Sequence, residues 1–307
     1  MLRKRDSAQR AKRTTRMKRN RPFFWAYLFL APTIALMLLF NYYPFFNTIQ
    51  ISMQSTDLFG RPSGFIGATN YESMFASPDF GQVMLRTGIF VVGIVAIKLF
   101  LGLAIALPLS SGLAGTIFVR PIVLIPMAFS AAVTSVIFKT MFAPKTGTFD
   151  QIFSALHIPG IPWLTHPLWA ILAILITISW TSMGMVILLL MSALDSIPKE
   201  VMEAASLDGV SGWRKIFSIQ LPLISPTIFF IVVTQTMSAL KEFTVIKILT
   251  NGGPNNATTT LTIQLYKLAF GSNVNYGVSA AYGTVLMVLV GIVAFVQFRL
   301  GERKVTY

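Results

Sequence analysis

A polar stretch, EVMEAASLDGVSGWRKIFSIQLPLISP at residues 200–226, separates two long apolar segments. Its first half contains five residues suited to a tight turn that meets another surface: Glu203, Ala204, Ala205, Asp208 and Gly209. The small alanine side chains allow close approach, and the two carboxylates can accept hydrogen bonds from backbone N–H groups at the turn. This pattern indicates a site that binds another surface.

The local pattern predicts a small helix–turn–helix. In SIPKEVMEAASLDG, Ser196 can cap a helix, Pro198 fits its first turn, and Gly209 suits a left-handed stop. A second helix restarts at Ser211, and its apolar stripe consists of Trp213, Ile216, Phe217 and Leu221. Two such short helices are not stable alone in water, so their apolar faces need either a partner protein or a lipid surface.

A second candidate site is the end of the next apolar segment, with Gln235, Ser238, Lys241 and Glu242 as candidate contacts for a polar substrate. The first three residues are three positions apart and project from one helix face. Glu242 lies about 100° from Lys241, so we expect it to pair with a neighbouring segment instead. Hydrogen bonding between helices without a ligand is an equal alternative. A lone charge in an earlier apolar segment, Lys98, is expected to pair between helices or to reach toward the interface, and contact with an anionic or polar substrate is the alternative.

Several kinds of chemistry are disfavoured. The chain has no cysteine, which excludes thiolate metal sites and cysteine nucleophiles. Its two histidines, His157 and His166, lie in one proline-rich loop without a carboxylate framework, so we expect no metal site. The phosphate-binding pattern G-x-x-x-x-G-K-[ST] does not occur. The sequence therefore predicts neither an enzyme nor an ATPase, and no cofactor of its own.

The composition points to a membrane protein. The 307 residues have a mean hydropathy of +0.68 and only 12% charged residues, about half the proportion in soluble domains. We predict an all-α fold with six spanning helices, at residues 23–43, 83–107, 121–142, 168–194, 221–240 and 278–298. They form one transmembrane domain over residues 23–300, with tails at 1–22 and 301–307.

The basic residues predict the orientation of the spans. Ten of the first 21 residues are Lys or Arg. With both termini on one side, that side carries 17 basic residues, including the tail and the 195–220 loop, and the other side carries five. Lys and Arg collect on the cytoplasmic side of spans. Both termini are therefore predicted in the cytoplasm, and the basic tail is expected to touch anionic lipid rather than nucleic acid.

The stretch EAASLDGV, followed by Phe217, LPL at 221–223 and Pro226, resembles the EAA loop of ABC-type importer permeases. SALDSIPKEVMEAA, LTNGGPNNATTTL and YGVSAAYG resemble its carbohydrate-uptake branch, which includes maltose-type and glycerol-phosphate-type permeases. The resemblance covers roughly residues 22–307. Two N-terminal spans and a large external insertion of the maltose type are missing.

The resemblance implies a type I importer permease in the plasma membrane of a bacterium or archaeon. Such a subunit would form half of the translocation pathway for a sugar, an oligosaccharide or a sugar-like polyol phosphate. Its partners would be a second permease, a dimeric cytoplasmic ATPase that binds ATP and Mg, an external binding protein and membrane lipid. Glu203, Ala204, Ala205, Asp208 and Gly209 would contact the ATPase. The alternative is a secondary transporter, which would need carboxylates or an unwound ion site within its spans.

Overall fold

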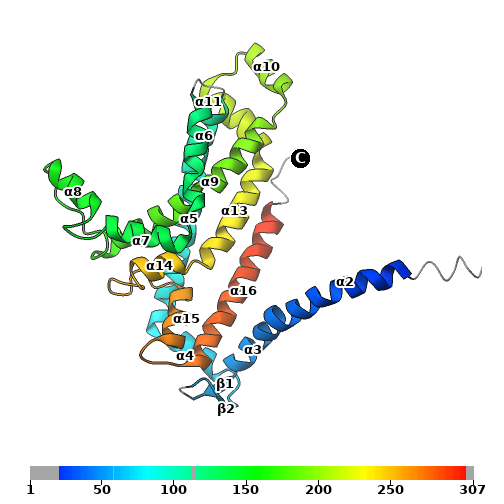
Figure 1. Ribbon diagram of the computed structural model, residues 1–307, viewed down its shortest axis with the longest axis vertical. Helices are drawn as coiled ribbons and strands as arrows, with labels where there is room; N and C mark the ends of the chain where they lie inside the picture. Colours follow the sequence, from blue (N-terminus) through cyan, green and yellow to red (C-terminus); the bar gives the residue numbers. More distant parts are fainter. Residues whose placement is uncertain (1–20, 58, 112–114, 302–307) are drawn as a thin grey trace, which may run out of the picture.

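The computed structural model describes residues 21–57, 59–111 and 115–301 of the chain, and these residues are mostly helical (Figure 1). The helices of the N-terminal half are α2 (Arg21–Met37), η1 (Leu38–Tyr42), α3 (Tyr43–Ser52), α4 (Thr69–Ala76), α5 (Pro78–Ser110), α6 (Thr116–Leu124), η2 (Ile125–Ala128), α7 (Ala131–Met141) and α8 (Thr148–Ala155). Those of the C-terminal half are α9 (Pro167–Asp195), α10 (Lys199–Leu207), α11 (Gly212–Lys215), η3 (Ile216–Gln220), α12 (Leu221–Leu223), α13 (Ser225–Leu240), α14 (Thr244–Leu249), α15 (Leu261–Phe270) and α16 (Tyr276–Gly301).

Two short strands interrupt this helical pattern. Strands β1 (Gln54–Thr56) and β2 (Pro62–Phe65) pair antiparallel, with Gln54 opposite Phe65. The prediction of an all-α fold is correct for the spans but missed this hairpin. Its turn contains Gly60 at φ +77, a conformation that glycine adopts without steric cost.

Among the described residues, four helical segments are long and apolar enough to cross a membrane: Ala26–Ser52, Pro78–Ser110, Pro167–Asp195 and Tyr276–Arg299. The other two predicted spans are bent pairs, Thr116–Ala128 with Ala131–Met141 and Gly212–Leu223 with Ser225–Leu240. The described residues therefore contain up to six spans, if each bent pair is counted as one.

The bends correct the expectation of uninterrupted spans at 121–142 and 221–240. The first pair turns by 98° because the helix tightens at Ile125–Ala128 and Phe129 is extended, after which Ser130 caps α7 through a 3.3 Å bond from the Val133 N–H. The second pair turns by 71° at Ile224, between two prolines that cannot donate helical hydrogen bonds.

The core is formed where α5 crosses α9 and α13. A Cβ at Gly102 of α5 would lie 2.8 Å from the side chain of Val186 on α9, so the missing side chain lets the two helices approach closely. The buried residues around this crossing include Ala106, Val186, Ile187, Leu190 and Ile231. This crossing brings residues of α5, α9 and α13, which lie far apart in the sequence, into one buried cluster.

The segment from Ala26 to Ser52 differs from the other spans because none of the residues in its most apolar stretch is buried against the rest of the chain. It contacts the rest of the chain mainly where α3 meets α16, and α2 extends away from the bundle (Figure 1). Its large exposed side chains include Phe29, Leu38, Leu39, Phe40 and Phe46. Such a surface needs either lipid or another protein to cover it.

The loop after α14 is a compact turn. Thr258, Thr259 and Thr260 are buried, and the Thr259 hydroxyl donates to the Gly252 carbonyl at 3.0 Å. Lys267 closes the turn by donating to Asn256 Oδ1 at 2.9 Å and to Thr259 at 3.1 Å. Burial lowers the pKa of Lys267, and the charges of Lys247 and Arg86 lower it further.

Candidate functional site

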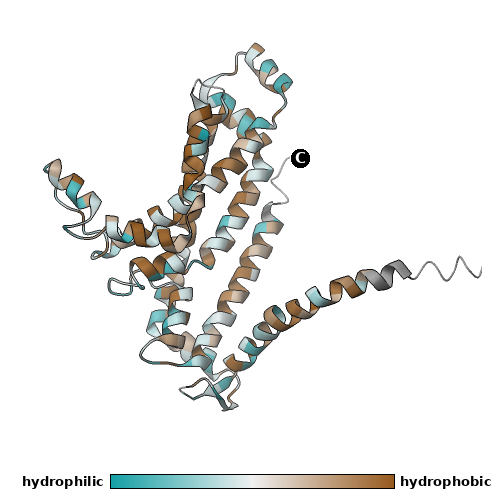
Figure 2. Cartoon of the chain, in the orientation of Figure 1, coloured by the Kyte–Doolittle hydropathy of each residue, from teal (hydrophilic) through white to brown (hydrophobic). Residues whose placement is uncertain are grey.

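The polar stretch forms a projecting helix at one end of the bundle, opposite the β1–β2 hairpin (Figure 1). Helix α10 carries hydrophilic residues, whereas the spans below it are mainly hydrophobic (Figure 2). Glu203, Ala204, Asp208 and Gly209 are exposed, and Ala205 is buried. The structure therefore brings all five predicted residues into one short element, four of them on its accessible surface.

The turn after α10 has the geometry of a glycine-terminated helix. The Val210 N–H donates to the Ala205 carbonyl at 2.9 Å, and the Gly209 N–H donates to the Ser206 carbonyl at 3.2 Å. These paired bonds form a Schellman motif. Gly209 has φ +71, and no atom lies within 4 Å of the position that a Cβ would occupy. The predicted left-handed stop is confirmed, and its requirement for glycine is conformational.

The start of α10 differs from the prediction. Ser196 does not cap it, since this residue ends α9 and its hydroxyl donates to the Ala193 carbonyl at 2.7 Å. Pro198 occupies the cap position instead and accepts the Val201 N–H through its carbonyl at 3.2 Å. Serine in this context can bond to a preceding helix as readily as to a following one. The fixed φ of proline therefore sets the start of the helix.

The second helix restarts at Ser211 as predicted, and its aromatic residues remain accessible. Trp213 and Phe217 stack with ring centroids 6.0 Å apart, yet Trp213 is 74% exposed. Leu207, at the tip of α10, is 89% exposed. The helix–turn–helix thus presents exposed apolar side chains beside its polar ones, as a docking element would.

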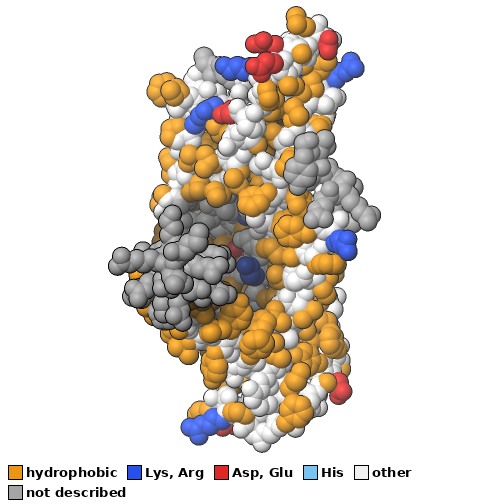
Figure 3. Space-filling view, turned by 90° about the vertical axis from the view of Figure 1, so that its right-hand side faces the viewer, with side chains coloured by type: hydrophobic (Ala, Val, Ile, Leu, Met, Phe, Trp, Pro, Cys, Tyr) orange, Lys and Arg blue, Asp and Glu red, His pale blue; other side chains and the backbone are white. Residues whose placement is uncertain are grey.

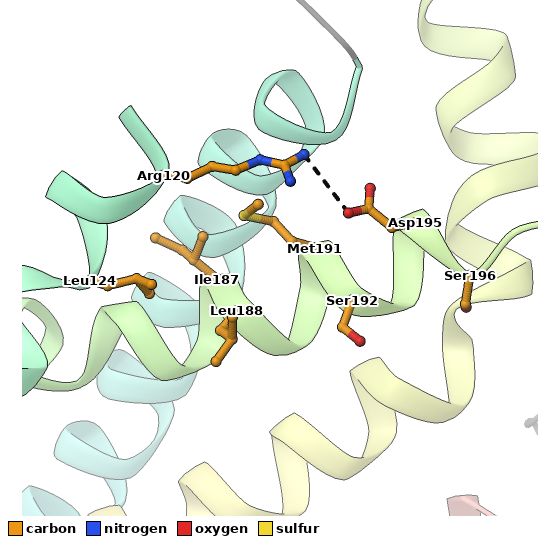
Figure 4. A pocket seen from close by; sticks show the side chains of 8 residues that line it. All are labelled: Arg120, Leu124, Ile187, Leu188, Met191, Ser192, Asp195 and Ser196. Carbon is orange, nitrogen blue, oxygen red and sulfur yellow. Dashed lines mark ion pairs between the residues drawn. The ribbon is translucent and has the colours of Figure 1, made fainter. Parts of the chain in front are cut away.

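A pocket of about 520 Å³ lies at the base of this element, between α6 and the end of α9 (Figure 4). Arg120 crosses it and forms an ion pair with Asp195 at 3.8 Å. Arg120 also donates to the Leu109 carbonyl at 2.9 Å, so one side chain joins α6 to the C-terminal ends of α5 and α9. The ion pair was not predicted, because Arg120 and Asp195 lie far apart in the sequence.

The candidate substrate residues separate into two groups. Lys98 is 2% exposed, and its ammonium donates to Gln235 Oε1 at 2.8 Å. This bond joins α5 to α13 and agrees with the predicted pairing of Lys98 between helices. Gln235 thus faces Lys98, although we expected it to share a face with Ser238 and Lys241.

Ser238, Lys241 and Glu242 line a groove of about 440 Å³ where α13 ends. Lys241 is exposed. Glu242 accepts the Val245 N–H at 3.0 Å, so its main contact is with the start of α14 rather than with a neighbouring span as expected. The groove offers a hydroxyl, an ammonium and a carboxylate, which can orient a polyhydroxylated or anionic solute.

The distribution of charge also fits a membrane protein. On the face seen in Figure 3, charged side chains gather mainly at the two ends, and most of the surface between them is hydrophobic. A hollow at mid-height contains both basic and acidic side chains. Within the described residues no group of His, Cys, Asp or Glu could hold a metal ion.

Residues 98–307 match the family described as "Binding-protein-dependent transport system inner membrane component". The sn-glycerol-3-phosphate transport system permease protein UgpA of Agrobacterium fabrum is 34% identical, over 92% of this chain and 96% of that protein. The lactose transport system permease protein LacF of Rhizobium radiobacter is 32% identical, over 91% and 94%. The trehalose/maltose transport system permease protein MalF of Thermococcus litoralis is also 32% identical, over 90% and 93%.

The fold is similar to that of a chain in the crystal structure of a bacterial ABC transporter involved in the import of the acidic polysaccharide alginate. The TM-score is 0.83 at 22% identity, over 94% of this chain and 99% of that chain. A second structure of an alginate transporter, in complex with a pentasaccharide-bound periplasmic protein, gives 0.81. On these grounds the chain belongs to the binding-protein-dependent inner-membrane permeases of ABC transporters, in the carbohydrate-uptake branch.

Proposed function

We propose that this chain is one of two permease subunits of an ATP-driven importer for a sugar, an oligosaccharide or a sugar-like polyol phosphate. The observation that carries the proposal is α10, a short helix that projects from the bundle and ends in a glycine-dependent turn. In this proposal α10 docks on a separate ATPase dimer, which binds ATP and Mg. Glu203, Ala204, Ala205, Asp208 and Gly209 form the contact, and closure of the dimer moves the spans.

The proposed orientation places both termini and α10 in the cytoplasm. Arg120, Lys199, Arg214 and Lys215 support it, because all four belong to the elements gathered around α10 (Figure 1). Tags at the termini and within 195–220 should be protected from external reagents in intact cells, whereas tags near Gly60, Gly147 and Asn255 should react. External labelling of the 195–220 loop would contradict this orientation.

The proposed substrate site is the groove at the end of α13. Ser238, Lys241 and Glu242 supply its polar groups, and Gln235, paired with Lys98, lies on the same helix about one turn before Ser238. The named substrates of the relatives, sn-glycerol 3-phosphate, lactose and trehalose/maltose, are all polyhydroxylated. A groove with few oriented polar groups suits a solute that is delivered by an external binding protein and held weakly.

The exposed α2–α3 segment is the surface that we assign to the second permease subunit. Its most apolar stretch has no residue buried against the rest of the chain, and a neighbouring permease would cover this surface. The compact 250–260 loop joins α14 to α15, which carry Lys247 and Lys267, and these elements lie on the hairpin side of the bundle, away from α10 (Figure 1). We place the external binding protein on this side. Neither this chain's groove nor its loops are proposed to carry out an enzymatic reaction.

Reconstitution tests this function against a secondary transporter. Proteoliposomes that contain this chain, its second permease and the ATPase should accumulate sugar only with ATP and the loaded binding protein. A matched preparation with a hydrolysis-deficient ATPase serves as the control. Uptake that follows an imposed proton or sodium gradient without ATP would contradict the proposal and support the alternative.

A further inference from the structure

A groove of about 750 Å³ lies between the C-terminal part of α5 and the segment 213–221. It is distinct from the proposed substrate groove, with which it shares no lining residue. Its volume falls within the range of about 300–1,000 Å³ that is usual for sites of small ligands. The groove therefore has room for an occupant larger than water.

One wall of the groove is apolar over a defined length. Its α5 side runs from Phe100 past Leu103 and Leu107 to Ser110. Ten residues of helix rise about 15 Å, which is half of the roughly 30 Å hydrocarbon core of a bilayer. The opposite wall is formed by Ile216, Phe217 and the stacked Trp213. The groove thus matches the depth of one leaflet, and its tryptophan lies at the end where the interface would be.

The end of the groove where α5 ends is polar and basic. Ser110, Ser111, Lys215 and Gln220 lie among its lining residues, and none of the lining residues is acidic. The Ser110 hydroxyl is buried and has no hydrogen-bond partner among the described residues. A buried hydroxyl without a partner is unfavourable, so an occupant that accepts its hydrogen bond is favoured. Lys215 adds a positive charge beside it, and Arg214 is its exposed neighbour in the chain.

We propose that this groove binds one anionic phospholipid from the leaflet at the α10 end of the bundle. The phosphate accepts hydrogen bonds from Ser110 and Lys215, and an acyl chain lies along Leu107, Leu103 and Phe100. A sugar substrate does not suit the long apolar wall, and an acidic peptide would leave that wall uncovered. The combination of a basic, hydroxyl-bearing end with an apolar wall one leaflet deep is the complement of an anionic lipid.

The bound lipid would touch the coupling element as well as the bundle. Met202 of α10 lines the same groove as α5 and η3, so the lipid fills the space between the projecting helix and the spans. This consequence, unlike lipid binding itself, rests on the proposed role of α10. Loss of the lipid would loosen α10 against α5 and reduce the coupling of ATP hydrolysis to uptake.

Lipid retention in the assembled transporter tests the proposal without relying on transport. The complex is purified from nanodiscs containing phosphatidylglycerol or phosphatidylcholine, and bound lipids are counted by native mass spectrometry. We expect one retained phosphatidylglycerol per copy of this chain and about fivefold lower retention in Lys215→Gln, as expected for one basic residue near an anionic lipid. Lys139→Gln, an exposed lysine on α7 outside the groove, is the matched control and should retain the lipid.

A second pair of variants tests the apolar wall. Ala104→Phe fills the groove, whereas Ala96→Phe adds the same side chain at an exposed position of α5 outside it. We expect the lipid to be lost only in Ala104→Phe. A photoreactive benzoylphenylalanine introduced at Ala104 would give a protein adduct if another subunit occupies the groove.

Equal retention of the two lipids, unchanged retention in both Lys215→Gln and Ala104→Phe, or a protein adduct from the Ala104 probe would overturn the proposal. These outcomes are independent of the proposed function, since an importer without this lipid site would still couple through α10. Conversely, lipid bound as described in a chain that does not transport with ATP would contradict only the proposed function.

Discussion

Replacing Gly209 with valine should weaken the binding of α10 to the ATPase without unfolding the chain. Gly209 has φ +71, and the space around its missing Cβ is empty, so the substitution causes no clash. The left-handed conformation costs an ordinary L-residue about 1–2 kcal/mol, and a β-branched side chain lies at the upper end of this range because it is the most crowded at positive φ. About 2 kcal/mol lowers the ratio of native to altered turn by about 30-fold. We therefore expect normal insertion, poor retention of the ATPase and no uptake.

A graded series identifies the physical cause. Asparagine tolerates positive φ better than alanine does, and alanine better than valine. Uptake should therefore decrease in the order Gly209→Asn, Gly209→Ala, Gly209→Val, measured at equal abundance in membranes. Gly88→Val is the control, because Gly88 is also exposed with open space around it but lies in a regular helix. Equal loss in all three variants, or normal uptake in Gly209→Val, would refute the conformational argument.

Other substitutions test the remaining contacts. Glu203→Lys should preserve abundance in the membrane but reduce ATPase co-purification, and unchanged co-purification together with normal uptake would contradict the assignment. Lys241→Ala should abolish uptake of an anionic substrate, because the negative charge of the substrate would lose the Lys241 ammonium as its partner. For a neutral sugar the same variant should weaken binding only by the roughly 0.5–1.5 kcal/mol of one hydrogen bond. Normal uptake in Ser238→Ala/Lys241→Ala would place the pocket elsewhere. Lys98→Met should destabilise the purified complex by about 1–3 kcal/mol, because it leaves Gln235 without its hydrogen-bond partner. The double variant Lys98→Met/Gln235→Leu should recover part of the lost thermal stability. A Lys98→Met complex as stable as the wild type would contradict this. Asp195→Asn should lower the free energy of unfolding by at most about 1 kcal/mol, since its ion pair with Arg120 is partly exposed. Arg120→Gln should lower it more, because this variant also removes the hydrogen bond to the Leu109 carbonyl. The reverse order of the two variants in thermal unfolding would contradict this.

The local features of the coupling element could be predicted from sequence because neighbouring residues determine them. Gly209 followed a helical pattern, and a glycine-terminated helix formed there. The cap at Pro198 was missed, since Ser196 could bond equally well to the helix before it. The bend at Phe129 was missed because average hydropathy over a window contains no information on helix direction. Hydropathy predicted where apolar segments lie but not which of them are continuous.

The contacts within the bundle had no comparable sequence signal. Lys98 and Gln235 are 137 residues apart, and only the crossing of α5 with α13 brings them together. The expectation that Gln235 shares a face with Lys241 assumed an uninterrupted helix, but α13 ends at Leu240. Arg120 likewise reaches Asp195 only because α6 packs against α9. Such pairings depend on the packing of whole helices, so composition and spacing alone do not determine them.

Site-directed cross-linking at α10 tests the coupling claim most directly. The chain contains no cysteine, so a single cysteine at Ala204, which is exposed on α10, can be paired with cysteines placed around the surface of a cysteine-free ATPase subunit. A cysteine at the exposed Ala96 of α5 is the matched control. We predict a disulfide or short cross-link from position 204 to one cleft of the ATPase, with a yield that changes on adding ATP, and none from position 96. No cross-link from position 204 in a complex that hydrolyses ATP and transports sugar would contradict the account.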